Sequence, residues 1–428
     1  MLKLHEIYGP VVRVAPNELS FDSAKSWADI YGVRKEHGNC FRKSRFYDGG
    51  NFADQAASIV SQRDHEKHQR MRKFLSRAFS EASLREQESL ISDTINQFVA
   101  RIAKEDVIDF THWFNLLTFD IIGKLAFGRD FKGISTGETH FWINDVLGSM
   151  AQASVADTLA RFPILGKVWL WFNPSWLSSV IKASTRHQQY TIDITNKRIN
   201  EPSPQKDFMS YLTQDRDGVS DIQLAAHASD FVIAGSETTA TTLAVVFYQM
   251  CTNITVQRKL ENEVLTAFQS YNDITAASAA PLKYLHAVCL EAMRVFPPLP
   301  LGLPRDVPPE GSTIDSVYVP GGVTVSTNPY AACMNAESFS DPQTFDPERW
   351  LNCSSEDVLE ASKPFSHGPR ACLGRSLAWL ELHVIIARLI YSYEFLLADE
   401  PFDWNANAEM HLLWKKPKLR MKLKQRCK

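Results

Sequence analysis

A helical repeat of apolar residues, running from about residue 84 to 270, is the strongest constraint on the fold of this chain. Its clearest run steps by four, three and four residues through Ile91, Ile95, Phe98 and Ile102. Apolar side chains at this spacing lie on one face of an α-helix and need a partner that buries them. Because the pattern continues over so much of the chain, it predicts a mainly α-helical protein.

Two apolar segments inside this region lead to different expectations. The segment LTFDIIGKLAFG (117–128) is almost wholly apolar and ends in glycine, which is typical of a buried helix with a glycine stop. The segment ARFPILGKVWLWFNPSWL (160–177) is also apolar but is interrupted by Pro163, Gly166 and Pro174. These residues favour an apolar surface loop over a membrane-spanning helix.

The β-structure is expected at the N-terminus and in the 300s. The stretch GPVVRVAPNELSF (9–21) combines β-branched residues with Pro and Gly and predicts a hairpin. From 297 to 350 the composition shifts to Pro, Gly, Val and Thr, and STIDSVYVPGGVTVSTN (312–328) predicts short strands. We therefore expect one domain over residues 1–428, with a small β-rich lobe from about 9–35 and 297–350 and a helical lobe from the rest.

Composition narrows the class of protein. The net charge of −3 gives no global argument for a nucleic-acid partner. The seven cysteines are odd in number and form no Cys-x-x-Cys pair, which argues against a zinc site or a disulfide framework and for a reducing compartment. The chain has no run of roughly 18 uninterrupted apolar residues, and its start, MLKLHEIYGP, has no apolar signal-peptide core.

Near the C-terminus, the stretch FSHGPRACLGRSLAWLELHVIIARLI (365–390) begins as a loop and becomes a helix, with Cys372 at the junction. The start of a helix offers unpaired N–H groups and the positive end of the helix dipole, which favour a thiolate and so a soft metal ligand. Gly368 and Gly374 let the backbone approach a flat ligand closely. Arg370 adds a cation beside the thiol.

Two simpler interpretations compete with a metal ligand. A single cysteine is more often a small buried hydrophobe. A nucleophile of the cysteine-hydrolase type would need a base, and His367, five residues away on the same loop, is poor evidence of one. The loop by itself leaves all three interpretations open.

The loop resembles the haem-binding loop of the cytochrome P-450 family, whose pattern is Phe-x-x-Gly-x-Arg-x-Cys-x-Gly. Every fixed position of the pattern is matched, by Phe365, Gly368, Arg370, Cys372 and Gly374. The resemblance implies that these residues bind the cofactor and that Cys372 is the axial thiolate ligand of the iron of haem b. It also implies the cytochrome P-450 fold, with the haem between the central long helix and the helix that follows the cysteine loop.

The stretch AGSETT (234–239) is a second match. On its own it would indicate a locally bent helix, because threonine hydroxyls bond to the i−4 carbonyls. It is also similar to the central-helix motif of the same family. The similarity implies that Ala234 and Gly235 border the haem, with Gly235 leaving room for dioxygen, and that Glu237 and Thr238 are the catalytic acid–alcohol pair that delivers protons.

A third match concerns structure. Glu291 and Arg294 in EAMR share a helix face, as ordinary surface ion pairs also do. The stretch FDPERW (345–350) adds Arg349. The three residues resemble the Glu–Arg–Arg cluster of the family, which implies a structural role.

The stretch RDHEKHQRMRKFLSRAFS (63–80) has two chemically distinct faces if it is helical. One face carries a basic stripe made of Arg63, Lys67, Arg70, Lys73 and Arg77. The stripe is either a solvated face or a docking face for an acidic redox partner. The opposite face carries His68 and Arg72, and the resemblance implies that these two residues, with Arg305 and Arg370, bind the haem propionates.

We also expect a substrate pocket beside the haem. Its expected walls are the loop 47–62, the helix near 141–160, Asp230 and Ile233, PLPLGLP (298–304), and the tip from Met410 to Trp414. Asp230 would be a polar group in this wall. It would either orient a substrate hydroxyl or cap a water network.

The matches extend from YGPVVRVAPNELSF to about residue 398 and look most like filamentous-fungal members of the family. The resemblance implies a haem-thiolate monooxygenase that inserts one oxygen atom of O2 into a lipophilic small molecule. The implied setting is a tailoring step in fungal secondary metabolism, on a terpenoid, polyketide or alkaloid. The implied electron source is NADPH through a cytochrome P-450 reductase, with cytochrome b5 as a further donor.

Three alternatives are weighed against this function. A haem-thiolate isomerase or dehydratase would not use O2, and such enzymes usually lack the acid–alcohol pair that Glu237 and Thr238 match. A truncated, inactive haem-binding protein would not need every chemical motif to be intact. A cysteine hydrolase would leave the other motifs unexplained.

The N-terminus departs from the pattern of microsomal members, which begin with a membrane helix and a Pro-rich hinge. This chain begins where those would end. We therefore expect a soluble, cytoplasmic chain with at most peripheral membrane contact through the apolar segment 160–177. A place on the cytosolic face of the endoplasmic reticulum is expected only if the full gene product carries the anchor.

Overall fold

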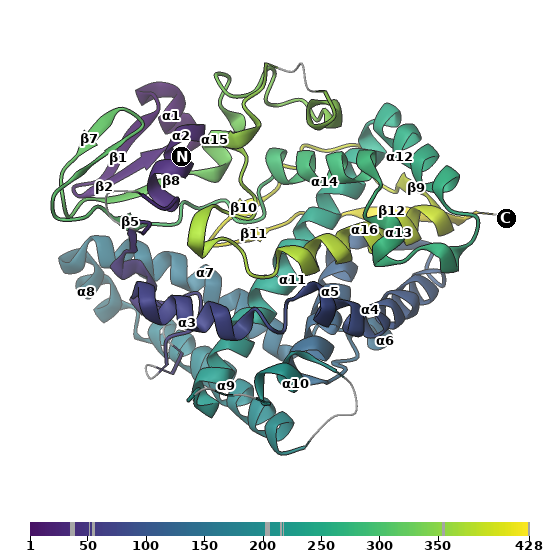
Figure 1. Cartoon of the computed structure of the whole chain (residues 1–428), viewed down its shortest axis with the longest axis horizontal. Coiled ribbons are helices and arrows are strands. Elements are labelled where there is room, and N and C mark those ends of the chain that lie inside the picture. The colour runs from purple at the N-terminus through teal and green to yellow at the C-terminus, as the bar shows by residue number, and fades with distance from the viewer. Residues whose placement is uncertain are drawn as a thin grey trace.

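The computed structural model describes residues 1–34, 39–50, 52–53, 56–201, 206–214, 216, 218–352 and 356–426. A small β-rich part lies at the upper left of Figure 1, and long helices fill the rest of the molecule. The prediction of a mainly helical fold with a small β portion is confirmed.

The elements follow one another along the described residues. The α-helices are α1 Leu2–Tyr8, α2 Ala24–Tyr31, α3 His65–Leu75, α4 Glu81–Ile102, α5 Phe110–Phe127, α6 Gly133–Thr136, α7 Phe141–Arg161, α8 Pro163–Phe172, α9 Pro174–Asn200, α10 Phe208–Leu212, α11 Asp221–Thr252, α12 Ile254–Ala267, α13 Ala276–Ala279, α14 Lys283–Val295, α15 Pro329–Met334 and α16 Arg375–Ser392. The strands are β1 Val11–Ala15, β2 Glu18–Phe21, β3 Arg42–Lys43, β4 Val107–Asp109, β5 Arg305–Asp306, β6 Ser312–Ile314, β7 Val317–Val319, β8 Thr324–Thr327, β9 Tyr393–Leu397, β10 Glu409–Met410, β11 Trp414–Lys415 and β12 Arg420–Gln425. Short 3-10 helices are η1 Arg45–Gly50, η2 Tyr271–Asp273, η3 Pro347–Trp350, η4 Leu359–Ala361 and η5 Gly368–Arg370.

The largest sheet joins both predicted β regions, in the strand order β1-β2-β8-β5-β3. The predicted N-terminal hairpin is confirmed as the antiparallel pair β1 and β2. Strand β2 then pairs in parallel with β8. At the other edge, β3 and β5 pair antiparallel and place Lys43 opposite Arg305. The sheet therefore brings two cations from distant parts of the sequence to one place.

The central helix is α11, which runs through the middle of the molecule against α5 (Figure 1). Ser220 caps its start by accepting the Gln223 N–H at 3.3 Å. Of the helices that the structure describes, α11 alone is long and apolar enough to cross a membrane. Inside the protein, however, 78% of its apolar window is buried. Burial on nearly all sides identifies it as the core helix of the fold.

Helix α5 confirms the prediction made from residues 117–128. Almost all of its side chains are buried. It ends at Gly128, whose φ of +61° lies in the left-handed region and whose N–H donates to the Lys124 carbonyl at 2.9 Å. Glycine adopts this conformation without steric cost, so it ends the helix where the pattern predicted.

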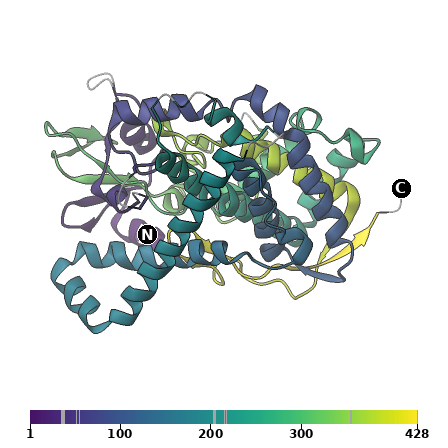
Figure 2. The same ribbon diagram turned by 90° about the horizontal axis from the view of Figure 1, so that it is seen from below.

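The prediction of a loop over residues 160–177 is wrong, because this segment is helical. Pro163 and Pro174 begin α8 and α9. Proline has no N–H, but the first turn of a helix does not use that N–H, so proline is favoured at this position. The segment does lie at the surface, and the side chains of Ile164 and Trp171 are each 79% exposed. Figure 2 shows α8 projecting from one end of the molecule, close to the N-terminus.

The Glu–Arg–Arg cluster forms as expected. Glu291 and Arg294 of α14 pair at 2.7 Å with both side chains fully buried, and Arg349 reaches the same carboxylate at 3.3 Å. Arg294 also donates to the carbonyl oxygens of Cys333, Pro342 and Thr344. Because every charge has partners, the cluster fastens α14 to the segment 333–350.

The basic stripe is shorter than predicted. Helix α3 begins after its cap Asp64, so Arg63 lies outside it. Arg63 instead pairs with Asp48 at 2.8 Å and with Asp306 at 3.5 Å. The exposed basic residues of α3 are Lys67, Arg70 and Lys73.

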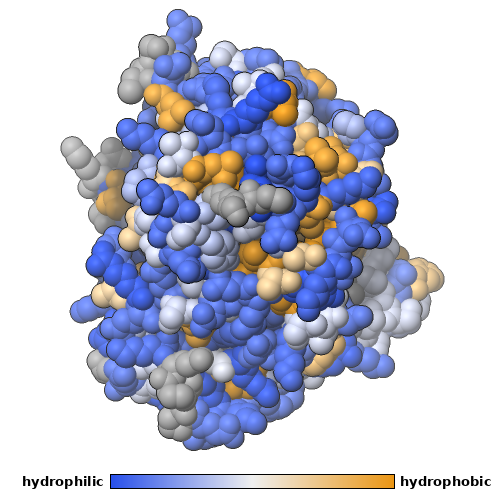
Figure 3. Space-filling model, turned by 90° about the vertical axis from the view of Figure 1, so that its right-hand side faces the viewer, coloured by the Kyte–Doolittle hydropathy of each residue, from blue (hydrophilic) through white to orange (hydrophobic). Residues whose placement is uncertain are grey.

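The face seen from the right-hand side of Figure 1 is largely hydrophilic, with small scattered apolar groups (Figure 3).

Candidate active site

A cavity of about 330 Å³ lies between α11 and the cysteine loop. Its wall includes ten of the predicted site residues, namely Cys372, Phe365, Arg370, Gly374, His68, Arg72, Arg305, Ala234, Gly235 and Thr238. Two predicted residues, Glu237 and Gly368, are not on this wall. The fold therefore gathers one thiol, four basic side chains and one face of the central helix around a single space.

The cysteine loop has a fixed shape. The Cys372 N–H donates to the Phe365 carbonyl at 2.9 Å, which closes the loop before α16 begins. Gly368 has a φ of +74°, and a Cβ there would lie 2.0 Å from the Tyr31 carbonyl oxygen of α2. No side chain fits this position. Gly368 thus lets the loop pack on α2, and we find no contact between it and the cavity.

The electrostatics of Cys372 differ from the expectation for a helix start. Burial raises the pKa of the thiol, whereas a hydrogen bond from Gly374 and the charges of Arg72 and Arg375 lower it, and the net direction is upward. Cys372 precedes the first residue of α16 by three positions, so the helix dipole does not dominate. Coordination by a metal ion would deprotonate the thiol outright.

The other cysteines do not compete for this role. In the part of the chain that the structure describes, Cys40, Cys251, Cys289 and Cys333 are free thiols, and none of them lies on the cavity wall. The same residues contain no group of three or more His, Cys, Asp or Glu side chains that could hold a metal ion. A metal in this cavity would therefore have one protein ligand and would need an organic ligand for the rest, as haem iron has.

Arg305 shows what the cavity is built to bind. Its side chain is 2% exposed, and its Nη1 donates to the Tyr47 hydroxyl at 3.0 Å and to the Pro304 carbonyl at 3.0 Å. Its Nε is buried and has no hydrogen-bond partner within the protein. A buried donor without a hydrogen-bond partner lowers the stability of the protein, so an acceptor on a bound ligand would stabilise this atom.

Arg370 repeats this arrangement from the cysteine loop. Its Nη1 donates to the Gln62 carbonyl at 2.6 Å, and its Nη2 donates to the Arg63 carbonyl at 2.9 Å. Its Nε is also buried and unpartnered. Two guanidinium groups that each hold a free buried N–H fit a ligand with two carboxylates, as haem b has.

His68 and Arg72 come from α3. His68 is buried, and burial together with the charges of Arg370, Lys43 and Arg72 lowers its pKa to about 3. A neutral imidazole keeps one N–H to donate. Arg72 donates from Nη1 to the Ala371 carbonyl at 2.6 Å, which ties α3 to the cysteine loop. The residues present therefore fit the propionate contacts that the sequence predicted.

Two further residues lie at this end of the cavity: Lys43, which sequence reasoning missed, and Tyr47, which it expected only as part of the pocket wall 47–62. Lys43 donates from Nζ to the Val60 carbonyl at 2.5 Å, and Tyr47 accepts the bond from Arg305. Both line the cavity. Neither belongs to a recognisable motif: the pairing of β3 with β5 places Lys43 opposite Arg305, and Tyr47 follows in η1.

The central helix presents threonines to the cavity. The Thr238 hydroxyl donates to the Ala234 carbonyl at 2.6 Å, and Thr242 donates to the Thr238 carbonyl at 3.1 Å. Such back-bonds loosen a helix. A Cβ on Gly235 would lie 3.0 Å from Ile122 Cδ1, so the missing side chain accommodates α5 and does not by itself open the cavity.

Of the two carboxylates near these threonines, the predicted one lies off the cavity wall and the other, which was not predicted, lies on it. Glu237 points away from the cavity and pairs with Lys416, whose Nζ lies 2.5 Å from its Oε2. Glu381 of α16, which sequence reasoning missed, lines the cavity. Burial raises the pKa of Glu381 to about 8, against a hydrogen bond from Thr239. The feature of the sequence that could have revealed Glu381 is a single acid four residues after Leu377, on the face of α16 that is buried.

The predicted pocket walls are partly as expected. Residues from three of the predicted segments line the cavity, namely Tyr47, Ile59, Val60, Asp230, Pro298, Leu299 and Leu303. Ile233 does not line the cavity, and neither does the tip at Met410 to Trp414. At the tip, Trp414 stacks on Phe296 and donates to the Pro297 carbonyl at 2.7 Å. In the helix near 141–160, many side chains lie outside the described residues.

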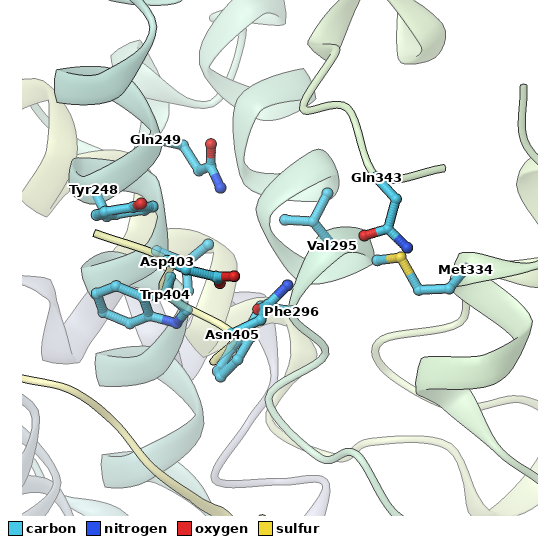
Figure 4. A pocket seen from close by; sticks show the side chains of 10 residues that line it. Tyr248, Gln249, Val295, Phe296, Met334, Gln343, Asp403, Trp404 and Asn405 are labelled. Carbon is cyan, nitrogen blue, oxygen red and sulfur yellow. The ribbon is translucent and has the colours of Figure 1, made fainter. Parts of the chain in front are cut away.

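A second cavity, of about 270 Å³, lies at the C-terminal ends of α11 and α14 (Figure 4). Polar groups reach it from Tyr248, Gln249, Gln343 and Asp403. The Trp404 Nε1 is buried there without a partner. Its lining contains no cysteine and none of the predicted site residues, so the chemistry is placed in the first cavity.

Known proteins resemble this chain over its whole length. The family described as Cytochrome P450 matches residues 1–423. "Cytochrome P450 monooxygenase ORF11" of Penicillium roqueforti is 47% identical over 94% of this chain and 85% of its own. "Cytochrome P450 monooxygenase BipB" of Cochliobolus sativus is 37% identical over 99% of this chain and 86% of its own.

A solved structure agrees on the fold. The crystal structure of the cytochrome P450DA heme domain superposes with a TM-score of 0.82, covering 99% of this chain and 92% of that chain. The two sequences are only 16% identical, so this likeness concerns the fold alone.

Proposed function

This chain belongs to the cytochrome P450 family, and we propose that it is a haem-thiolate monooxygenase formed by one domain over residues 1–428. The observation that carries the proposal is the cavity in which the single thiol of Cys372 faces α11 beside two buried, unpartnered guanidinium N–H groups. Haem, when bound there, supplies the redox chemistry that activates dioxygen with two electrons. One oxygen atom enters the substrate and the other leaves as water.

The residues of the cavity would divide the binding work. Cys372 would be the axial thiolate ligand of the iron. Arg305 and Arg370 would donate from Nε to the two carboxylates of the haem, and His68 and Arg72 stand at the same end. These charge-assisted bonds would satisfy both orphan donors at once.

The apolar part of the cavity would select the substrate class. Its walls carry the apolar side chains of Phe79, Ile122, Phe231 and Leu299. Such walls exclude water and gain free energy from burying apolar ligand surface. We therefore propose a lipophilic small molecule as the substrate.

Proton delivery is assigned to α11. The Thr238 hydroxyl would leave its back-bond to the Ala234 carbonyl and hold a water, or pass on a proton, at the edge of the cavity. Glu237 lies one residue before it and would resupply protons when its ion pair with Lys416 opens. The pair holds this acid away from the cavity until then.

Electrons would come from NADPH through a cytochrome P450 reductase, with cytochrome b5 as a further donor. The exposed residues Lys67, Arg70 and Lys73 on α3 are proposed as contacts for acidic groups of such a partner. Helix α3 touches the cysteine loop through Arg72, so a partner bound there would stand close to the haem.

The biological setting is proposed from the relatives, which are named monooxygenases of filamentous fungi. We propose that this enzyme tailors a fungal secondary metabolite. The alternatives are a haem-thiolate isomerase or dehydratase that uses no O2, and an inactive haem-binding protein. Thr238 on the cavity wall favours the monooxygenase over both.

The test is NADPH consumption by the haem-loaded chain with a cytochrome P450 reductase, measured together with dioxygen uptake and oxidised product from a panel of terpenoids, polyketides and alkaloids. A monooxygenase consumes NADPH, O2 and substrate in equal amounts. Product formed without O2 would favour the isomerase, and a chain that binds haem but never forms product would favour the inactive protein.

A peripheral membrane contact is proposed at α8. Its exposed apolar side chains are Ile164, Leu165, Val168, Trp171 and Phe172, with Phe162 at its N-cap. Ile7 and Tyr8 of α1 are also exposed, and Arg161 beside α8 pairs with Glu18 of the N-terminal hairpin. Figure 2 shows α8 near the N-terminus, and the exposed apolar side chains of the two helices suit contact with the surface of the endoplasmic reticulum. Sedimentation with phosphatidylcholine vesicles tests this, and Trp171→Ser should reduce binding.

A further inference from the structure

Two carboxylates, Asp230 and Glu381, line the main cavity, and Asp230 lies among apolar residues of its wall. Asp230 lies on α11 four residues, or about one turn, before Ala234, so the two share a helix face. Its neighbours on the wall include Ile59, Val60 and Phe231. Burying an acid among such residues costs free energy unless hydrogen bonds or an opposite charge compensate it.

Tethering the adjacent loop does not explain the acid by itself. Asp230 accepts the Val60 N–H at 3.1 Å on Oδ2. The same loop is already held by His227, whose Nδ1 accepts the Ile59 N–H at 3.2 Å, and by Lys43, whose Nζ donates to the Val60 carbonyl at 2.5 Å. The loop is thus tied on two sides without the carboxylate.

The carboxylate keeps spare acceptor capacity. Burial raises the pKa of Asp230 to about 6, while hydrogen bonds from Ser58 and Val60 and the charge of Lys43 lower it. At pH 7.5 the group is therefore mostly ionised and can only accept. A carboxylate has about four acceptor positions, and two donors from the protein, Ser58 and Val60, use part of them.

The charges nearby select the kind of donor. Lys43 lines the same cavity and its charge acts on Asp230, so a cationic ligand would meet positive charge beside the acid. A neutral hydroxyl donates one hydrogen bond and carries no charge. Of the common donors, an alcohol therefore suits this position better than an ammonium group.

We propose that Asp230 binds a hydroxyl group of the substrate and thereby fixes which carbon is presented for oxidation. The proposal rests on the proposed monooxygenase function and names its substrate as a hydroxylated lipophilic molecule. Asp230 and Thr238 are eight residues apart on one helix, which is about 12 Å along its axis. The anchored hydroxyl would therefore lie well away from the carbon that is oxidised.

The test compares two probes that differ in one proton donor, 1-adamantanol and 1-methoxyadamantane. Both are titrated into the haem-loaded chain at pH 7.5, and the dissociation constant is read from the shift of the Soret band. We expect the alcohol to bind roughly tenfold more tightly than the ether, because the hydrogen bond to a charged acceptor is lost in the ether. In Asp230→Leu this preference should fall to about onefold.

Two further variants separate the anchor from the tether. Asp230→Asn keeps an acceptor for the Val60 N–H but loses the charge, so the preference should shrink while the loop stays in place. Ser58→Ala removes a donor from the loop and keeps the carboxylate, so the preference should persist. A preference that is absent in the wild type, or equal in the wild type and both Asp230 variants, overturns the proposal.

The reduced, carbon-monoxide-bound spectrum of each variant keeps the two proposals apart. A normal thiolate spectrum with no alcohol preference overturns the role of Asp230 and leaves the monooxygenase standing. A wild-type chain without the thiolate spectrum overturns the monooxygenase first.

Discussion

Lys416 Nζ lies 2.5 Å from Glu237 Oε2, and the two side chains are only 2% and 5% exposed. The same ammonium group donates to the Thr241 hydroxyl at 3.1 Å. Lys416 comes from the segment between β11 and β12, and Glu237 from the central helix. The pair therefore fastens the C-terminal segment to α11 and turns the acid away from the cavity.

Replacing Lys416 by methionine should destabilise the protein, because it leaves a buried carboxylate without its partner. Losing one member of a buried pair costs about 3–5 kcal/mol. The double variant Lys416→Met with Glu237→Gln should recover most of this loss. Urea unfolding of the haem-loaded proteins measures both, and a single variant as stable as the wild type would show that the pair contributes nothing.

Thr238→Ala should leave haem binding intact and uncouple the reaction. Without this hydroxyl, proton delivery at the edge of the cavity is no longer controlled, so more of the reduced dioxygen should leave as peroxide for each NADPH consumed. Thr252→Ala is the matched control, since Thr252 makes the same back-bond at 3.0 Å at the far end of α11. If Thr238→Ala and Thr252→Ala give equal coupling, Thr238 has no part in proton delivery.

Arg305→Met should speed the loss of haem, because its Nε would no longer meet a propionate. A charge-assisted hydrogen bond of this kind changes an equilibrium by roughly tenfold or more. Transfer of haem to apomyoglobin measures the rate. Tyr47→Phe breaks the bond to Arg305 Nη1 but keeps the guanidinium, so it should change the rate much less. Equal rates for wild type and Arg305→Met would remove this residue from the haem site.

Glu381 should make the stability of the protein depend on pH. Its pKa is raised from 4.5 to about 8 in the folded state, so the folded protein keeps a proton that the unfolded chain loses. The free energy of unfolding should therefore fall as pH rises from about 4.5 to about 8, by at most about 1.4 kcal/mol per pH unit. Below and above this window Glu381 contributes no slope.

Glu381→Gln should flatten that dependence. Urea unfolding at a series of pH values measures the slope, and Glu81→Gln, on the exposed side of α4, is the control. Parallel curves for the wild type and Glu381→Gln would mean that the acid does not hold a proton in the folded protein.

The sequence predicted the parts of the fold that depend on local pattern. The apolar repeat gave α4 and α5, and the glycine stop at Gly128 is where the pattern placed it. Pro163 and Pro174 led to the wrong prediction of a loop. Proline breaks a helix when it lies inside, but it is favoured at the first helical position, where both of these residues lie. Periodicity alone does not separate these two uses.

The site was predictable where a motif fixes residues at short spacing. The cysteine loop and AGSETT reached one cavity as expected. The direction of Glu237 was not predictable, because it depends on Lys416, which is 179 residues away. Lys43 was missed for the same reason, since only the pairing of β3 with β5 brings it to Arg305, and Tyr47 was expected in the pocket wall but not as a partner of Arg305.

The most direct test is the difference spectrum of the reduced, carbon-monoxide-bound protein, recorded for the wild type, Cys372→Ala and Cys40→Ala. Cys40 is a buried free thiol near Arg370 and serves as the control. The wild type and Cys40→Ala should show a strongly red-shifted Soret band, and Cys372→Ala should lose it. A wild-type band at the position of histidine or neutral ligation, or a red-shifted band that survives in Cys372→Ala, would contradict the assignment of Cys372 as the haem ligand.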